Sequence, residues 1–225
     1  MRSFDLTLYV SSHQAWERQL IIKPFVPLSM IGHFETFITA EVSLTKEELK
    51  LMCSLATEKK LRRRQLLLHE GEVCRFKAFV VKGLLRTYCT RDDGAEYNMR
   101  FAVENGWMLD TESYNSQLPS KYNIEALEDT EVLLWSRENM DKIFEAIPAF
   151  RSYSEKLKTS SHDANLNRIL MNISYTAEEK YQEFVNSFPD VFRRIPLHMV
   201  ASYLGVSRET LSRIRHAQLK RQKEF

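Results

Sequence analysis

The sequence has few cysteines and no long apolar run. Its three cysteines, Cys53, Cys74 and Cys89, lie far apart and form no Cys-x-x-Cys pair, so the spacing of zinc and thiol-redox sites is missing. No stretch approaches the ~20 apolar residues that a membrane-spanning helix needs. Residues 1–29 contain no continuous apolar segment typical of a secretion signal. We therefore predict a cytoplasmic protein that has reduced thiols and does not insert in a membrane.

The side-chain arrangements of enzymes and metal sites are also missing. There is no paired nucleophile and base, no phosphate-binding loop and no metal-ligand spacing, and the histidines His69, His198 and His216 stand isolated. Glu70-Gly-Glu72 brings two carboxylates close together, but its position at a predicted turn favours a structural role. We therefore predict a protein that is not an enzyme and holds no metal.

Charge is distributed unevenly along the 225 residues, although the net charge is only +2. Residues 191–225 contain eight Lys and Arg against two acids, whereas residues 92–145 contain thirteen acids against four bases. The length favours two domains, and a hydrophobic fraction of 44% is enough for a packed core. The C-terminal part is thus the one expected to meet a polyanion. A basic surface is often merely solvated, so this interpretation needs a motif.

The central region predicts a β-structure. From about residue 64 to 135, short β-branched and aromatic runs alternate with turn residues, and glycines recur every eleven or twelve residues, at Gly71, Gly83, Gly94 and Gly106. The Asp92-Asp93-Gly94 and Asn105-Gly106 segments are typical of hairpin turns. This spacing favours an antiparallel β-roll or jelly roll. On periodicity alone, another β-sandwich remains the alternative.

Helical patterns flank this region. Residues 43–52 predict a helix capped by Ser43 or Thr45, and residues 149–173 predict a longer one after Pro148. Six residues form a stripe on the longer helix at a spacing of mostly three or four: Phe150, Tyr153, Leu157, Ser161, Ala164 and Met171. The stripe has two interpretations, a packing face within the chain or the seam of a two-helix dimer.

Residues 197–215 have the pattern of a helix-turn-helix. Ala201 is the small residue needed where two helices cross, and Gly205, four residues later, suits the left-handed turn. Ser207 is a natural N-cap for the second helix, and Pro196 suits the first turn of the first. The core between the helices is expected to contain Val200, Leu204, Val206, Leu211 and Ile214.

The outer face of the second helix is polar. It carries Arg208, Glu209, Ser212, Arg213 and His216. Arginine can bind guanine O6 and N7, glutamate can accept from cytosine N4, and serine can reach bases or phosphates. We predict that Ser207 and these five residues contact DNA, with residues 207–219 lying in the major groove. The alternative is a surface helix pair without a DNA function.

The segment Ser207-Arg-Glu-Thr-Leu-Ser-Arg resembles the recognition helix of the CRP/FNR family of transcription regulators. The resemblance extends over roughly residues 40–220, with Glu70-Gly-Glu, Lys82-Gly83 and Asp93-Gly94 at the β-roll turns. It implies an α+β fold with an N-terminal β-roll, a long connecting dimerisation helix and a C-terminal helix-turn-helix. It also implies that Arg208, Glu209 and Arg213 read base edges, and that duplex DNA, a second copy of the chain and RNA polymerase are partners.

The cyclic-nucleotide sensors of this family hold the ribose with a glutamate and the phosphate with an arginine. Aligned backwards from Ile124-Glu-Ala, these positions fall on Asp110 and Ser120. The arginine is therefore missing, and we do not expect cAMP to bind in the usual way. A pocket for another small molecule is expected to involve Asp110, Glu112, Ser120 and Lys121, with ordinary turn and surface roles as the alternative. No cysteine precedes Cys53, which argues against the iron–sulfur cluster of the family's oxygen sensors.

The predicted organisation has four parts: an irregular extension over residues 1–29, a β-roll sensor with flanking helices over 30–148, a dimerisation helix over 149–173, and a helix-turn-helix domain without a clear wing over 174–225. Without a wing, the basic residues Arg215, Lys220, Arg221 and Lys223 are the candidates for phosphate contacts. The alternative function is a ligand-binding or protein-interaction module that does not bind DNA.

Overall fold

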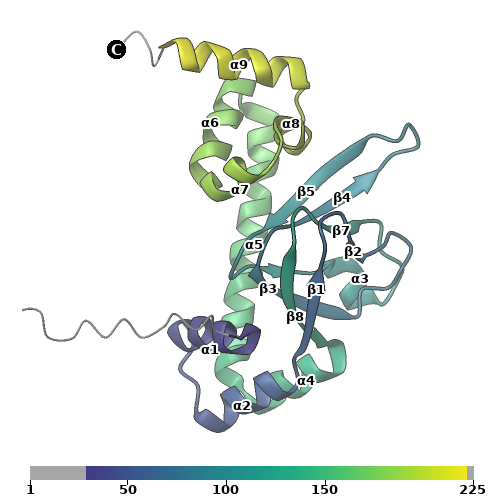
Figure 1. The fold of residues 1–225 in the computed structure, drawn as a ribbon, viewed down its shortest axis with the longest axis vertical. Coiled ribbons are helices and arrows are strands. Elements are labelled where there is room, and N and C mark those ends of the chain that lie inside the picture. Colours follow the sequence, from purple (N-terminus) through teal and green to yellow (C-terminus); the bar gives the residue numbers. More distant parts are fainter. Residues whose placement is uncertain (1–28, 222–225) are drawn as a thin grey trace, which may run out of the picture.

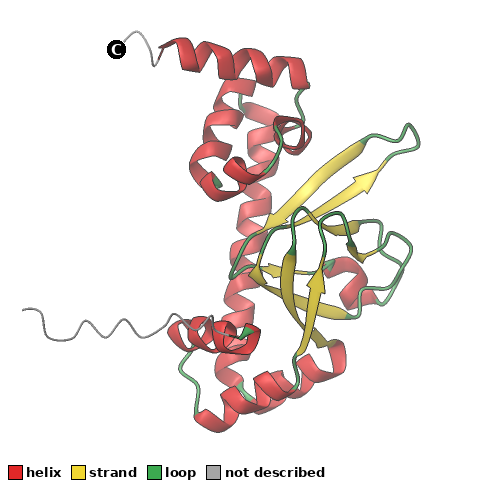
Figure 2. Cartoon of the chain, in the orientation of Figure 1, coloured by secondary structure: helices red, strands yellow, loops and turns green. Residues whose placement is uncertain are grey.

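The computed structural model describes residues 29–221, in which two β-sheets are followed by a long helix and a group of shorter ones (Figures 1 and 2). The strands are β1 Thr57–Leu61, β2 Leu66–Leu68, β3 Phe76–Lys82, β4 Leu85–Thr90, β5 Glu96–Ala102, β6 Trp107–Met108, β7 Asn123–Ala126 and β8 Thr130–Ser136. The helices are α1 Met30–Glu41, α2 Lys46–Ser54, α3 Thr111–Ser116, α4 Arg137–Ala146, α5 Pro148–Ser174, α6 Ala177–Ser187, α7 Pro189–Arg194, α8 Leu197–Leu204 and α9 Arg208–Arg221. Within this described part, no helix is both long and apolar enough to cross a membrane.

The two sheets are antiparallel and pack face to face. Their strand orders are β1-β8-β3-β6 and β2-β7-β4-β5. Apolar side chains from both sheets fill the space between them, and the largest of those that are at most 1% exposed include Leu68, Leu85, Met108, Ile124 and Val132. This arrangement confirms the predicted antiparallel β-roll.

The roll turns at the predicted glycines, but one of the two expected hairpins does not form. Gly83 joins β3 to β4 at φ +103, and a Cβ there would lie 2.4 Å from Thr130 Oγ1, so no other residue fits without a shift. Gly94 closes the expected hairpin between β4 and β5. The expected hairpin at Asn105-Gly106 is wrong, because this turn connects β5 and β6, which belong to different sheets.

Four helices cover the outer side of the first sheet. Helices α1, α2, α4 and the start of α5 enclose a second apolar core with β3 and β8. Trp135 is fully buried there, and its indole N–H donates to the carbonyl of Met52 over 2.8 Å. Thr45 caps α2, as one of the two predicted candidates. Helix α1 and strand β1 were not expected from the sequence, and residues 1–28 of the expected extension lie outside the described residues.

The long helix α5 has 27 residues and leads from the roll to the C-terminal helices. The predicted stripe turns toward the chain's own body: Tyr153, Leu157, Ala164 and Met171 line a groove that α5 shares with β5 and α8. A second apolar set lies on the opposite side of the helix, at Leu166, Ile169, Leu170 and Ile173, and these four side chains are 51–79% exposed.

Candidate nucleic-acid interface

Helices α8 and α9 form the predicted helix-turn-helix. Gly205 ends α8 in the left-handed conformation, with φ 67 and ψ 32, which glycine adopts without steric cost. The next amide, that of Val206, donates to the carbonyl of Ala201 over 3.1 Å and closes the turn. Pro196 is the residue before α8 rather than part of its first turn.

The inner faces of the two helices share one core. Val200, Ala201, Leu204 and Leu211 are buried, at no more than 3% exposure, and Val206 and Ile214 pack partly buried against them. The hydroxyl of Ser207 accepts a hydrogen bond from the amide of Thr210 over 3.1 Å, which confirms Ser207 as the N-cap of α9. The predicted core and cap therefore hold α9 at a fixed angle to α8.

The outer face of α9 is exposed to solvent. Arg208, Glu209, Arg213 and His216 are exposed and Ser212 is half-buried, whereas Leu211 on the opposite side is buried. Within residues 29–221, none of these five polar side chains forms a hydrogen bond or an ion pair. The hydroxyl of Ser207, in contrast, is engaged by Thr210.

The charge on this face is mostly positive. Arg208, Arg213 and Arg215 are exposed, and Glu209 is the one acid of α9. Among the candidates for phosphate contacts, the structure therefore places Arg215 at the surface. The side chains of Lys220 and Arg221, and all of Lys223, lie outside the described residues.

The helix-turn-helix rests on strand β5 of the roll through polar contacts that the sequence did not indicate. The amide of Asn98 donates to Ser202 Oγ over 3.0 Å, and that hydroxyl donates to the carbonyl of Glu96 over 2.7 Å. Asn98 Nδ2 donates to the carbonyl of Met199 over 3.2 Å. Because Asn98 is 2% exposed, the two bonds that it donates are partly shielded from water, whereas the bond from Ser202 to Glu96 is exposed.

Arg168 links the long helix to the same contact. Its guanidinium donates to the carbonyls of Met99, Asn98 and Tyr203, with distances of 3.2 Å and 3.1 Å for the last two. It also lies 4.1 Å from the centre of the Tyr203 ring, in cation–π geometry. One side chain therefore connects α5, β5 and α8.

Arg194, at the end of α7, forms the ionic part of the contact. Its guanidinium binds both carboxylate oxygens of Glu104, over 2.8 Å and 3.0 Å, and also binds Glu128. Burial by itself raises the pKa of Glu104, but the hydrogen bonds from Arg194 and from backbone amides, together with the charge of Arg194, outweigh this, and the pKa lies below its usual value. The same bonds raise the pKa of Arg194.

These docking residues carry no local signal in the sequence. The partners of Arg194 lie 66 and 90 positions away, and those of Ser202 lie 104 and 106 positions away. Periodicity and short motifs report only on neighbours along the chain, so they place these residues on helices and strands but do not pair them.

The four candidate effector residues lie together at the start of α3. Asp110 caps this helix, and its second oxygen accepts from Ser120 Oγ over 2.7 Å, so these two buried side chains satisfy each other. Lys121 and Glu112 form an exposed ion pair of 2.9 Å. The site is thus assembled as a group, while its role as an effector pocket stays a prediction.

Comparison with known proteins shows that the β-roll matches a known domain family. Residues 58–146, from β1 to the end of α4, match the family model described as the cyclic nucleotide-binding domain. No curated protein sequence matches the chain significantly.

Solved structures share this fold over most of the chain. FixK2 from Bradyrhizobium japonicum is 22% identical, with a TM-score of 0.64 over 75% of this chain and 86% of that one. A protein from Eubacterium rectale described as a transcriptional regulator of the CRP/FNR family is 19% identical, with a TM-score of 0.61 over 79% and 85%. The c-di-GMP-responsive global regulator CLP of Xanthomonas campestris is 12% identical, with a TM-score of 0.63 over 78% and 93%. At these identities the likeness establishes the fold.

Proposed function

We propose that this chain, which has the fold of the CRP/FNR transcription regulators and carries a domain of the cyclic nucleotide-binding family, is a sequence-specific DNA-binding regulator. It acts as a homodimer, reads the major groove with residues 207–219 and responds to a small molecule bound in the β-roll. In this proposal residues 30–148 form the sensor, 149–173 the dimerisation helix and 174–225 the DNA-binding domain.

The observation that carries the proposal is the outer face of α9. Arg208, Glu209 and Arg213 project from a helix whose opposite face is buried, and they have no partner within the described chain. Unpaired arginines on a rigid helix can bind guanine bidentately, because no internal ion pair has to be broken first. Each such contact contributes about 1–3 kcal/mol of discrimination between bases.

The second copy is expected to pack on α5. Leu166, Ile169, Leu170 and Ile173 form an apolar stripe on the side of α5 that faces away from the body of the chain. A side-by-side pairing of two such helices would bury the stripe. The two recognition helices of a two-fold dimer would then lie about 34 Å apart and read a nearly palindromic site.

DNA binding can be tested by selecting binding sites from a pool of random duplexes with the purified chain. For the selected site, Arg208→Ala combined with Arg213→Ala is expected to weaken binding at least about 30-fold, because two base contacts are lost. The matched control, Lys142→Ala combined with Lys156→Ala, removes the same charge from exposed positions on α4 and α5 and is expected to keep most of the affinity. Equal losses in the two double variants would refute base reading by α9.

The dimer can be tested by sedimentation equilibrium. Leu170→Glu combined with Ile173→Glu places two charges on the exposed stripe and is expected to give a monomer that keeps its helical content. Lys156→Glu, on the same helix but outside the stripe, is expected to leave the dimer intact. A double variant that remains dimeric would show that the seam lies elsewhere.

The effector of the β-roll is expected to differ from cAMP. Ser120 occupies the position of the phosphate-binding arginine and already donates to Asp110, so a cyclic phosphate would meet a carboxylate rather than a cation. Thermal unfolding with and without cAMP at millimolar concentration checks this expectation. A saturable rise in the unfolding temperature that Ser120→Ala abolishes would contradict it.

A further inference from the structure

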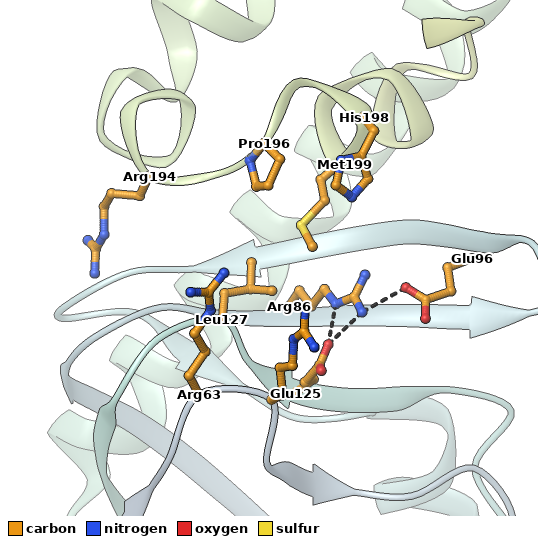
Figure 3. A pocket seen from close by; sticks show the side chains of 10 residues that line it. Arg63, Arg86, Glu96, Glu125, Leu127, Arg194, Pro196, His198 and Met199 are labelled. Atoms are coloured by element: carbon orange, nitrogen blue, oxygen red, sulfur yellow. Dashed lines mark hydrogen bonds and ion pairs between the residues drawn. The ribbon is translucent and has the colours of Figure 1, made fainter.

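A cavity of about 390 Å³ lies between the β-roll and the start of α8 (Figure 3). One wall comes from the roll and includes Arg63 and Arg64, in the turn between β1 and β2. The other wall comes from the C-terminal helices and includes His198 and Met199. No residue of α9 or of the Asp110–Ser120 group lines it. A ligand here would touch both units of the chain at once.

The floor of the cavity is a closed ion network. The Arg86 side chain is only 6% exposed, and its guanidinium binds Glu125 over 2.6 Å and Glu96 over 2.7 Å. It also lies 3.9 Å from the centre of the Tyr88 ring. Arg194 at the edge is likewise paired, with Glu104 and Glu128. These two arginines are paired with four carboxylates, so neither of them is a free cation for a ligand.

Three other side chains that line the cavity can donate hydrogen bonds and do not take part in these ion pairs. Within the described residues, the side chains of Arg63, Arg64 and His198 form no hydrogen bond or ion pair. The carboxylate of Asp129 lies close by, but it accepts from the backbone amide of Arg63 rather than from its guanidinium. Figure 3 shows that the Arg63 side chain extends from the roll toward Leu127 and that His198 projects from α8 on the opposite side of the cavity.

The backbone at Arg64 is strained. Its φ is 68, a left-handed value that few residues other than glycine adopt. The conformation is unfavourable for a residue with a Cβ, and it is held by a hydrogen bond of 2.7 Å from the Arg64 amide to the carbonyl of Ala126. Glycine would remove this cost. Strain of this kind clusters at ligand-binding sites, where the side chain is needed.

We propose that this cavity binds a small anion that carries phosphate or carboxylate groups. Arg63 and Arg64 bind the anionic group from the roll, since guanidinium groups match these oxygens in charge and in geometry. His198 donates a hydrogen bond from α8. The bound anion bridges the two units and strengthens the docking of the helix-turn-helix on the roll. The site is separate from the proposed DNA contacts, because recognition of the anion does not involve α9.

The test is a calorimetric titration of the full chain with inorganic phosphate, pyrophosphate and citrate, with sodium chloride keeping the ionic strength constant. Wild type is expected to bind at least one of the three saturably, and the comparison of pyrophosphate with citrate identifies the anionic group. Arg63→Ala combined with Arg64→Gly is expected to raise the Kd at least tenfold. The control Arg62→Ala removes an exposed arginine of the same turn that does not line the cavity, and its Kd is expected to stay within twofold of wild type.

His198→Ala tests the second wall and is expected to raise the Kd at least threefold. The Arg64→Gly change is expected to keep the fold, because glycine adopts the observed φ freely; Arg63→Gln alone is the substitute if the double variant unfolds. The proposal is overturned if none of the three anions binds saturably, if Arg62→Ala weakens binding as much as the double variant, or if His198→Ala binds like wild type. DNA is absent from these titrations, so this proposal and the DNA-binding proposal fail separately.

Discussion

Replacing Arg194 with alanine is expected to loosen the docking of the C-terminal helices on the β-roll. The substitution leaves Glu104 and Glu128 without their cation, while Glu104 keeps its bond to the amide of Gly83. The neighbouring Arg193 provides a matched control. Its guanidinium contacts only α7, through an ion pair with Asp190 and a hydrogen bond to the carbonyl of Pro189, and the side chains of the ion pair are at least 70% exposed.

The expected loss follows from the exposure of the groups. Hydrogen bonds to charged groups contribute about 1.5–3 kcal/mol when buried, and exposed ion pairs about 0–1 kcal/mol. The side chains of Arg194, Glu104 and Glu128 are 23%, 35% and 41% exposed, which places the loss near 2 kcal/mol, or roughly a 30-fold rise in the undocked population. The apolar part remains, because Leu84 stays buried and Phe101 stays against the Tyr203 ring.

Hydrogen exchange of the Asn98 amide measures this opening directly. The amide donates to Ser202 Oγ across the contact, so its protection depends on docking rather than on the sheet alone. In Arg194→Ala its exchange is expected to accelerate roughly 30-fold, in proportion to the undocked population. In Arg193→Ala it is expected to stay within about twofold of wild type. Equal exchange in the two variants would refute the assignment of Arg194 as the ionic link.

Three other changes have expected outcomes. The pKa of Glu104 lies below its usual 4.5. The contribution of Glu104 to the stability of docking is therefore complete above about pH 4.5 and is lost as the pH falls through the lower pKa of the folded state. Hydrogen exchange of the interface amides, measured over pH 3–6, is expected to follow this loss. Burial lowers the pKa of Lys77 from 10.5 to about 8, so the free energy of unfolding rises with pH between these two values. Lys77→Met is expected to abolish that rise and to increase the free energy of unfolding at pH 7 by about 1–3 kcal/mol, as measured by urea unfolding. Gly83→Ala is expected to cost more than about 2 kcal/mol because its Cβ would overlap Thr130, whereas Gly94→Ala, with no atom within 4 Å, is expected to cost about 1 kcal/mol; similar losses would contradict the overlap.

The parts of the molecule that the sequence predicted are those with a local cause. The helix-turn-helix depends on Ala201, Gly205, Ser207 and Leu211, which lie within eleven residues, and each has the predicted role in the core, turn or cap. The β-roll turns at Gly71, Gly83 and Gly94 depend on a positive φ, which is a property of the single glycine.

What the sequence did not predict depends on distant contacts. Strand β1 contains Glu58, Lys59 and Lys60, and it is a strand because it pairs with β8, about 70 positions away. Helix α1 is stabilised by burial of Phe34 and Ile38 against the roll. The stripe on α5 was open to two interpretations, because periodicity gives the spacing of a face and not the element that covers it.

The core beneath the helix-turn-helix belongs in part to another segment of the chain. Leu84 is fully buried among the C-terminal helices, and Phe101 packs against the same cluster, although both come from the roll. An isolated C-terminal fragment would therefore expose the apolar surface that covers them. We expect the roll and the helix-turn-helix to melt in one cooperative transition. Modular exchange of the C-terminal part between related proteins would then succeed only where residues equivalent to Leu84 and Phe101 are exchanged with it.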